Sequence, residues 1–496
     1  MKVALIRLLG SDRFDFNSAD YNVGLRYLAE IVRNLGAVAD IFDPLCADDV
    51  DLAAQKLSGA YSMIGFTVHH LNVLETLTLV EAVKRRNAAV YIILGGHHVS
   101  ATATEILQDC RAVDAVCVGD GEDIMQHLTR LLLAGKPSTN HLPRGVLRPE
   151  RAWELGLLPV PSPPSSFSTA RILTSRGCPY NCSFCTTPAM RGIASDPSYR
   201  VRDPDSVIEE IRMLKRLGIR EIRVNDDLFF SRSTQSRSRV QEIAKKILVN
   251  GFDIQYRAQL RVDSVTENDV EFLKVLRQSG LRSVFLGVES GNNAILDEYN
   301  KRTNLQYAVD ALSLYHRARI SVNAGNILLS PDGTVEDVLE SIEGFHKMGL
   351  AFLFFRRVTF CAHVFPGTAL ESRLEQEGRL ERKRRYFMRS YTFRDPRLEE
   401  LARPIEQMMP QFLLKIGGEL FRLRDRIVRA YYDDRQTLRR DPMPFLADWN
   451  QKSKDFLCCY FSRPNNPATR SRATELFEWY TSYCETLKRG FLRCFI

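Results

Sequence analysis

Three cysteines in one short loop are the residues of this chain whose types and spacing point most directly to chemistry. Cys178, Cys182 and Cys185 occur in the segment Cys-Pro-Tyr-Asn-Cys-Ser-Phe-Cys, directly after an apolar run at residues 170–175. An iron–sulfur cubane takes four ligands, usually thiolates, so a loop with three of them leaves one iron open to a ligand from outside the protein. A structural zinc site closes with four ligands, and no second CxxC or HxxxH pair lies near this loop. We therefore expect a [4Fe–4S] cluster here, with a partial zinc knuckle or a chance grouping as the alternatives.

The CxxxCxxC spacing resembles that of the radical S-adenosylmethionine (SAM) family. In that family the unligated iron chelates the amino and carboxylate groups of SAM, and the residue before the last cysteine is usually aromatic, as Phe184 is here. The resemblance implies SAM and the [4Fe–4S] cluster as cofactors and an electron donor such as flavodoxin or ferredoxin as a partner. An electron delivered to the cluster would cleave SAM to a 5′-deoxyadenosyl radical, which takes hydrogen from an unactivated carbon.

Residues 1–136 carry the pattern of an α/β domain. Short apolar runs alternate with amphipathic segments, which is typical of a parallel sheet with crossover helices. We expect a doubly wound, Rossmann- or flavodoxin-like domain with five strands, at residues 3–8, 38–42, 62–68, 90–94 and 115–118. Ligands of such sheets bind beyond the carboxyl ends of the strands. The expected ligand loops are therefore residues 9–22, 67–71, 95–100 and 119–122.

Glycine and histidine are concentrated in three of these loops: Thr67-Val-His-His70, Gly95-Gly-His-His98 and Gly119-Asp-Gly-Glu122. Any one of them alone indicates turn glycines with surface histidines, but together they resemble the cobalamin-binding domain of B12-dependent radical SAM enzymes. Glycine lets the backbone approach a large planar ligand closely. The resemblance implies cobalamin as a cofactor, with contacts from Thr67, Val68, His69, His70, Gly95, Gly96, His97, Gly119, Asp120, Gly121 and Glu122.

One cobalamin signature is missing from this domain. The DxHxxG motif, which supplies a histidine to cobalt in methionine-synthase-like proteins, does not occur. We therefore expect the lower face of cobalt to be vacant, water-bound or near His69 or His70.

Beyond a proline-rich linker at residues 137–169, a second run of strand–helix units at residues 170–370 predicts a partial (β/α)6 barrel. Barrel sites lie at the carboxyl ends of the strands. Carboxylates there could hold the ammonium and ribose groups of SAM, and an arginine could pair with its carboxylate. The expected SAM contacts are Phe184, Asn225, Asp226, Arg261 and Glu289, and a buried Arg261–Glu289 ion pair is the alternative. Similar motifs in the B12-dependent group match Asp226-Asp-Leu-Phe229, Gly287-Val-Glu-Ser-Gly291 and Phe365-Pro-Gly-Thr368.

Composition limits the class of protein. The chain has 496 residues, of which 45% are hydrophobic and 26% charged, as in ordinary globular proteins. No apolar run is long enough to span a bilayer, and the odd, scattered cysteines suit a reducing compartment, so we expect a cytoplasmic protein. The net charge of +8 is modest, and no helix-turn-helix or aromatic–basic surface indicates a nucleic-acid partner.

The leading hypothesis is a cobalamin-dependent radical SAM C-methyltransferase. Methylcobalamin would give a methyl group to a carbon of a small-molecule or peptide substrate, and the helical region at residues 371–496 would shape the substrate site. Relatives with the same two domains catalyse cyclisation or ring contraction, and the cofactor motifs do not separate these reactions. A methylthiotransferase would need three more cluster cysteines in the first domain. A cobalamin or iron–sulfur sensor is the alternative outside enzymes.

Overall fold

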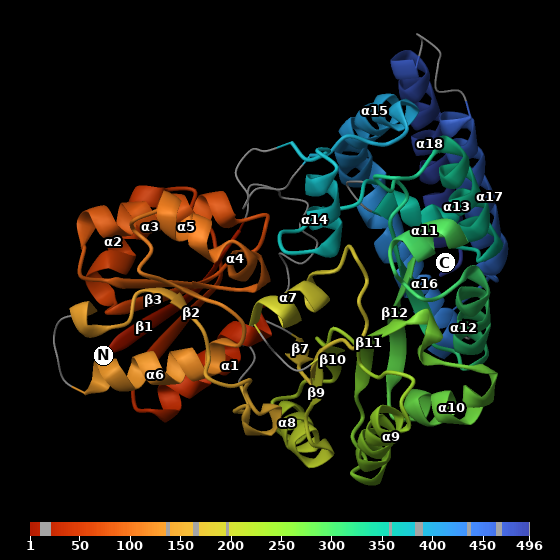
Figure 1. The fold of residues 1–496 in the computed structure, drawn as a ribbon. Helices are drawn as coiled ribbons and strands as arrows, with labels where there is room; N and C mark the ends of the chain where they lie inside the picture. The colour runs from red at the N-terminus through yellow and green to blue at the C-terminus, as the bar shows by residue number, and fades with distance from the viewer. Residues whose placement is uncertain are drawn as a thin grey trace. The chain divides into compact units, whose positions relative to one another are not determined.

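The computed structural model describes residues 1–9, 21–134, 139–161, 168–194, 198–356, 360–381, 390–433, 438–462 and 469–495. The chain forms two compact units (Figure 1). Unit 1 contains Met1–Asp227 and Val364–Ser390, and unit 2 contains Leu228–His363 and Tyr391–Ile496.

Unit 1 begins with a six-stranded parallel sheet in the order β2-β1-β3-β4-β5-β6. Its strands are β1 (Lys2–Leu8), β2 (Val38–Leu45), β3 (Met63–Thr67), β4 (Tyr91–Gly95), β5 (Ala115–Cys117) and β6 (Gly145–Leu147). The helices between them are α1 (Val23–Asn34), α2 (Val50–Ala60), α3 (Val73–Arg86), α4 (His97–Ala101), α5 (Ala103–Asp109) and α6 (Gly121–Leu133).

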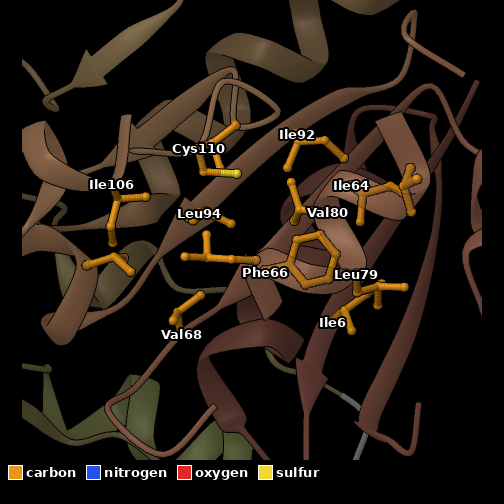
Figure 2. Close-up of a cluster of buried hydrophobic side chains, with 14 of the residues drawn as sticks. Ile6, Ile64, Phe66, Val68, Leu79, Val80, Ile92, Leu94, Ile106 and Cys110 are labelled. Carbon is orange, nitrogen blue, oxygen red and sulfur yellow. The ribbon is translucent and has the colours of Figure 1, made fainter. Parts of the chain in front are cut away.

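Helices cover both faces of this sheet. Successive side chains of a strand point to opposite sides, so each strand contributes side chains to both packing layers. On one side, Ile64, Phe66 and Ile92 pack against α2, α3 and α5 (Figure 2). On the other side, Met63 and Ile93 pack against α1 and α6. Near-continuous apolar runs such as β1 are therefore buried on both faces, as a doubly wound sheet requires. The predicted fold class is confirmed.

The sequence predicts five strands, and the structure adds a sixth. Strand β6 arises within the proline-rich segment and pairs in parallel with β5 at the edge of the sheet. Strand β6 has only three residues and none of them is buried, so it shows no hydrophobic period in the sequence. Of the predicted ligand loop at residues 9–22, residues 10–20 lie outside the described part of the chain.

The rest of unit 1 carries the cysteine loop. Strands β7 (Thr169–Ile172) and β10 (Glu221–Val224) pair in parallel, and β8 (Ser175–Gly177) and β9 (Tyr199–Val201) form an antiparallel pair. The strand expected before the cysteines is thus divided between β7 and β8. The helices of this part are α7 (Thr186–Ala194), α8 (Pro204–Arg216) and α14 (Ala369–Gln376).

Unit 2 contains three parallel strands and most of the helices of the second half. The strands are β11 (Gln255–Arg261), β12 (Leu281–Glu289) and β13 (Ser321–Asn326). The helices are α9 (Thr234–Val249), α10 (Val270–Gln278), α11 (Asn293–Glu298), α12 (Leu305–Arg317), α13 (Val335–Lys347), α15 (Pro396–Phe412), α16 (Gly418–Asp433), α17 (Met443–Phe461) and α18 (Thr469–Leu492), with a π-helical turn at Leu413–Gly417 between α15 and α16. None of the described helices combines the length and hydropathy needed to cross a bilayer.

The apolar run at residues 351–360 predicts a last strand for the barrel, and this prediction is wrong at residues 351–356. Ala351–Arg356 forms a 3-10 helix, and residues 357–359 lie outside the described part. The run is apolar at nearly every position, so its period cannot separate strand from helix. The deciding contacts come from the C-terminal helices, because Phe352 stacks on Trp449 with ring centroids 4.6 Å apart and Phe355 stacks on Tyr480 at 4.3 Å.

Gly280, before β12, provides a test of close backbone packing in unit 2. Its φ is +115°, and a Cβ there would overlap the carbonyl oxygen of Ile254. Gly251 also has a positive φ, +61°, but a Cβ there would meet nothing within 4 Å. We expect Gly251→Ala to lower the free energy of unfolding by about 1 kcal/mol, the cost of a left-handed residue with a side chain. Gly280→Ala should cost about 1–3 kcal/mol more, because the backbone must shift. Equal losses in urea denaturation would contradict this.

Candidate functional site

The three cysteines lie in the loop between β8 and α7. Cys182 is buried and Cys178 and Cys185 are half-buried. Asp227 supports the loop at both ends, since its carboxylate accepts a hydrogen bond of 2.9 Å from the Gly177 N–H and one of 3.4 Å from the Thr187 hydroxyl. The loop is therefore anchored on the residues that follow β10.

The donor set of this loop fits an iron–sulfur cluster. Burial raises the pKa of the Cys185 thiol, hydrogen bonds from Thr187 oppose the rise, and the charges of Cys182 and Asp227 add to it. Burial disfavours the charged thiolate of Cys185, and a cationic partner such as iron would stabilise it. Among the described residues, no three His, Cys, Asp or Glu side chains stand close enough to hold one metal ion. A cubane does not require that, because each of its protein ligands binds a different iron.

Asp226, expected to contact SAM, is engaged within unit 1. Its carboxylate accepts hydrogen bonds from the Thr174 N–H at 2.7 Å, the Thr174 hydroxyl at 2.5 Å and the Ser175 hydroxyl at 2.8 Å. The side chain is 3% exposed. Asp226 thus fixes the chain where it passes from β7 to β8. Asn225 lies nearby and accepts a hydrogen bond of 2.7 Å from Arg171, and Phe184 is half-buried in the cysteine loop.

Arg261 and Glu289 both lie at strand ends in unit 2, as predicted. Arg261 ends β11 and pairs with Asp263 at 2.8 Å, and one of its guanidinium nitrogens donates to the carbonyl oxygen of Lys301. Glu289 ends β12 and pairs with the Lys301 ammonium at 2.9 Å. Lys301 therefore links the two predicted residues.

Two glycines make room for the Glu289–Lys301 pair. Gly287 and Gly325 are partners in the β12–β13 register. A Cβ at Gly287 would lie 2.7 Å from the Glu289 carboxylate and 2.8 Å from the Lys301 ammonium, and one at Gly325 would lie 3.0 Å from the other Glu289 oxygen. The carboxylate and the ammonium thus lie over a floor formed by Gly287 and Gly325, beside the Phe285 ring, which comes within 3.1 Å of a Cβ at Gly325.

The backbone around this pair is strained. Within the described ranges, four non-glycine residues have positive φ, and three of them are Glu289 at 69°, Asn300 at 49° and Arg302 at 54°. Such conformations cost energy and cluster at functional sites. Lys301, which Asn300 and Arg302 flank, is the residue that the sequence analysis missed. Only the motif Gly-Val-Glu-Ser-Gly pointed to this region, since nothing in a lone lysine twelve positions later marks it.

The three glycine–histidine loops follow the neighbouring strands β3, β4 and β5. They meet at the carboxyl end of these strands, which we call the sheet edge. The Val68 N–H donates to the Gly95 carbonyl oxygen at 2.8 Å. Gly96 has a φ of +113°, and a Cβ there would lie 2.7 Å from the Val68 carbonyl oxygen. Gly96 is thus needed for the two loops to touch. By contrast, a Cβ at Gly95 would meet only the Cys117 Cβ, 4.0 Å away, so this position leaves space beside the sheet edge, which fits a large planar cofactor.

Histidines surround this edge. The ring centroids of His69 and His70 are 6.1 Å apart, and those of His70 and His98 are 6.3 Å apart. Phe365, from the predicted Phe-Pro-Gly-Thr motif, lies 5.2 Å from His70. His97 is exposed, whereas His98, which was not among the predicted contacts, is buried. The Phe365 segment also reaches the cysteine loop, because the Leu370 N–H donates to the Ser183 carbonyl oxygen at 2.9 Å.

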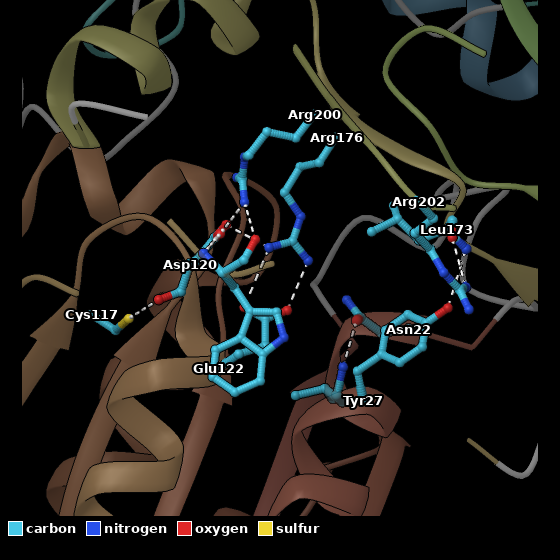
Figure 3. Close-up of polar contacts among 11 residues, drawn as sticks. Asn22, Tyr27, Cys117, Asp120, Glu122, Leu173, Arg176, Arg200 and Arg202 are labelled. Carbon is cyan, nitrogen blue, oxygen red and sulfur yellow. Dashed lines mark hydrogen bonds and ion pairs between the residues drawn. The ribbon is translucent and has the colours of Figure 1, made fainter. Parts of the chain in front are cut away.

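Asp120 and Glu122, predicted near cobalamin, bind arginines of the β8–β9 pair (Figure 3). Asp120 pairs with Arg176 and with Arg200, the latter at 2.7 Å, and Glu122 pairs with Arg176 at 2.8 Å. Burial alone would raise the pKa of Asp120, but the charge of Arg176 and the hydrogen bond from Arg200 outweigh it and lower the pKa below its usual value. The carboxylates are therefore held by the chain itself. Gly119, with a φ of +90°, remains the part of this loop whose backbone a ligand could approach, since a Cβ at Gly121 would lie 3.5 Å from Leu28 of α1.

Two family models match the chain. The model of the radical SAM superfamily matches residues 172–345, and the model of the B12 binding domain matches residues 18–129.

Among curated proteins, the chain is similar to three relatives of different described activities. It is 27% identical to the uncharacterized methyltransferase PH0819 of Pyrococcus horikoshii over 70% of this chain and 77% of that protein. It is 28% identical to the hopanoid C-3 methylase of Methylococcus capsulatus over 62% and 61% of the two chains. It is 23% identical to the anaerobic magnesium-protoporphyrin IX monomethyl ester cyclase of Rubrivivax gelatinosus over 65% and 60%.

Among solved structures, the chain is similar to the cobalamin-dependent SAM radical enzyme OxsB with aqua-cobalamin and SAM bound. The TM-score is 0.72 at 14% identity, over 99% of this chain and 79% of that one. Taken with the family models, this fold defines a radical SAM enzyme with an N-terminal B12-binding domain. The chain thus combines a radical SAM domain, which implies SAM and an iron–sulfur cluster as cofactors, with a B12-binding domain, which implies cobalamin.

The Glu289–Lys301 pair should be energetically coupled. Lys301→Met leaves the Glu289 side chain, which is only 13% exposed, without its cation, and breaking a buried ion pair in this way typically costs about 3–5 kcal/mol. The double variant Lys301→Met/Glu289→Gln removes both charges, and we expect it to recover a large part of this loss in urea denaturation. If the losses of Lys301→Met and Glu289→Gln simply add in the double variant, the two side chains do not form the pair described.

Proposed function

We propose that this chain is a cobalamin-dependent radical SAM C-methyltransferase. The observation that carries the proposal is the construction of unit 1. Its cysteine loop and its glycine–histidine sheet edge, two sites suited to different cofactors, are joined by residues 365–370 and by the Asp120–Arg176 ion pair. The names of two relatives, a methyltransferase and a C-3 methylase, support methyl transfer to carbon.

In this proposal, Cys178, Cys182 and Cys185 hold a [4Fe–4S] cluster, and Gly95, Gly96, His69 and His70 lie against cobalamin. When bound, these cofactors and SAM supply a carbon-centred radical that abstracts hydrogen and a methyl group that can be transferred. The chain itself binds and orients. Asp227 and Asp226 fix the two ends of β8 and thereby the entry to the cysteine loop.

We assign SAM contacts to Glu289 and Lys301, and retain Arg261, Phe184 and Asn225 as further candidates. A carboxylate and an ammonium at one strand end complement the two charges of the methionine part of SAM. Glu289 and Lys301 each present such a group over the Gly287–Gly325 floor. Asp226 has a different role in this assignment, since its carboxylate oxygens are engaged by Thr174 and Ser175.

Cyclisation or ring rearrangement is the second candidate, because a cyclase is among the relatives. The two reactions differ in stoichiometry. Methylation adds one CH2 to the substrate, whereas an oxidative cyclisation removes two hydrogens and a rearrangement leaves the mass unchanged. The substrate, a small molecule or a peptide, and an electron donor such as flavodoxin or ferredoxin complete the proposed reaction.

Single alanine variants at Cys178, Cys182 and Cys185 test the cluster site. We expect each to lose most of the iron and of the broad visible absorption of the anaerobically reconstituted protein, because a cubane lacking a protein ligand is not retained. Cys459→Ala, at a half-buried thiol on α17, should leave both unchanged. Full iron content and absorption in all three variants would refute the assignment.

The mass of the product tests methylation. The reduced, fully loaded enzyme with SAM carrying a deuterated methyl group should add one labelled methyl carbon to a metabolite in an extract of its source organism. We expect the product to carry one CD3 group in place of one hydrogen of the substrate, with all three deuterium atoms retained. A product formed without the label, with two hydrogens fewer or with unchanged mass, would favour the second candidate.

A further inference from the structure

Four charged side chains form a compact cluster in unit 1 between the N-terminal sheet and the cysteine loop. We call Asp120, Glu122, Arg176 and Arg200 the junction cluster (Figure 3). The two acids come from the turn between β5 and α6, and the two arginines come from β8 and β9. All four side chains are largely buried, with 5% of each carboxylate side chain exposed.

The two arginines depend on the two acids. Arg176 and Arg200 are directly opposite in the antiparallel register, where like charges destabilise a strand pair. Asp120 receives both guanidinium groups, one on each carboxylate oxygen, and Glu122 takes the second nitrogen of Arg176. The Asp120 carboxylate also accepts a hydrogen bond of 3.1 Å from the backbone N–H of Trp153. The acids precede and begin α6, where the helix dipole favours negative charge.

The junction cluster is tied directly to the cysteine loop. Arg176 is two residues before Cys178, and only Gly177 separates them. Gly177 has a φ of +89°, and a Cβ there would lie 2.7 Å from the Ser198 carbonyl oxygen, so the strand pair is closely packed at this point. Its N–H is held by Asp227. A displacement of Arg176 should therefore also displace Cys178, because the single residue between them is closely packed.

The same cluster is tied to the sheet edge. Asp120 and Glu122 flank Gly121 and follow Gly119, which has a φ of +90°. The Asp120 carbonyl oxygen accepts the Cys117 thiol at 3.6 Å, which attaches the turn to the end of β5. A ligand that presses on the backbone of this turn would thus press on the partners of Arg176.

We propose that the junction cluster couples the two cofactor sites, with Arg176 as the positioning residue, so that a loaded cysteine loop strengthens cobalamin binding at the sheet edge and the reverse. This inference rests on the proposed assignment of the two cofactors to these sites. Coupling between two sites is reciprocal, and its usual size is about 5- to 150-fold in affinity.

The experiment measures the dissociation constant of hydroxocobalamin for the full chain with and without its reconstituted cluster. In the unaltered protein we expect the cluster to tighten cobalamin binding by roughly tenfold. In Arg176→Gln this ratio should fall towards one, and Arg176→Lys, which keeps the charge, should restore part of it. Glu122→Gln, which keeps the size of the side chain, should reduce the ratio as well and serves if Arg176→Gln does not fold.

Arg144→Gln is the matched control. Arg144 pairs with the buried Asp114 in the same domain, away from the β5–α6 turn, so its loss should leave the ratio unchanged. A ratio near one in the unaltered protein, or a full ratio in both Arg176→Gln and Glu122→Gln, would overturn the coupling. Failure of the unaltered protein to bind either cofactor would instead overturn the proposed function, because the ratio would then be undefined for every variant.

Discussion

Buried carboxylates need donors, and this requirement shapes both cofactor regions of the protein. Asp226, Asp120 and Glu289 are each at least largely withdrawn from water, and an unpaired charge in such a place costs several kcal/mol. Each is therefore surrounded by hydrogen-bond donors or cations of the chain. The identity of those donors decides whether a carboxylate supports the structure or is available to a ligand.

The three acids differ in this respect. Asp226 and Asp120 each accept at least three hydrogen bonds from the chain, which uses much of the capacity of a carboxylate. They fix the segment before the cysteines from two directions. Glu289 instead shares one oxygen with Lys301 over a pair of glycines, in strained backbone, at the end of β12. The geometry of Glu289 is therefore that of a ligand-binding carboxylate, whereas Asp226 and Asp120 support the structure.

The C-terminal helices have a structural part in unit 2. Aromatic side chains of α17 and α18 stack on the Ala351–Arg356 turn, and Asn450 of α17 accepts the Ala351 N–H at 2.8 Å. Residues after 390 therefore complete the core of the unit that carries Glu289 and Lys301.

The sequence by itself determined the elements of the fold and the nature of the cofactors. Hydrophobic runs located every strand of the N-terminal sheet except β6. Strand β5 is as short as β6, but all three of its residues are buried, whereas none of the three residues of β6 is. The spacing of Cys178, Cys182 and Cys185 pointed to the radical SAM class, which the family models confirm. The spacing of the thiols and the composition of the glycine loops involve residues only a few positions apart, so both can be recognised from the sequence.

Only the tertiary structure decided which partners the polar residues have. Asp120 binds Arg176, which lies 56 residues later in the sequence, and Asp226 binds Thr174, which lies 52 residues earlier. Glu289 binds Lys301, which follows it only after helix α11. Periodicity assigns a residue to a face, but it does not say which distant donor reaches that face. The 3-10 turn at Ala351–Arg356 has the same cause, since its aromatic run became helical through contacts with helices about 100 residues later.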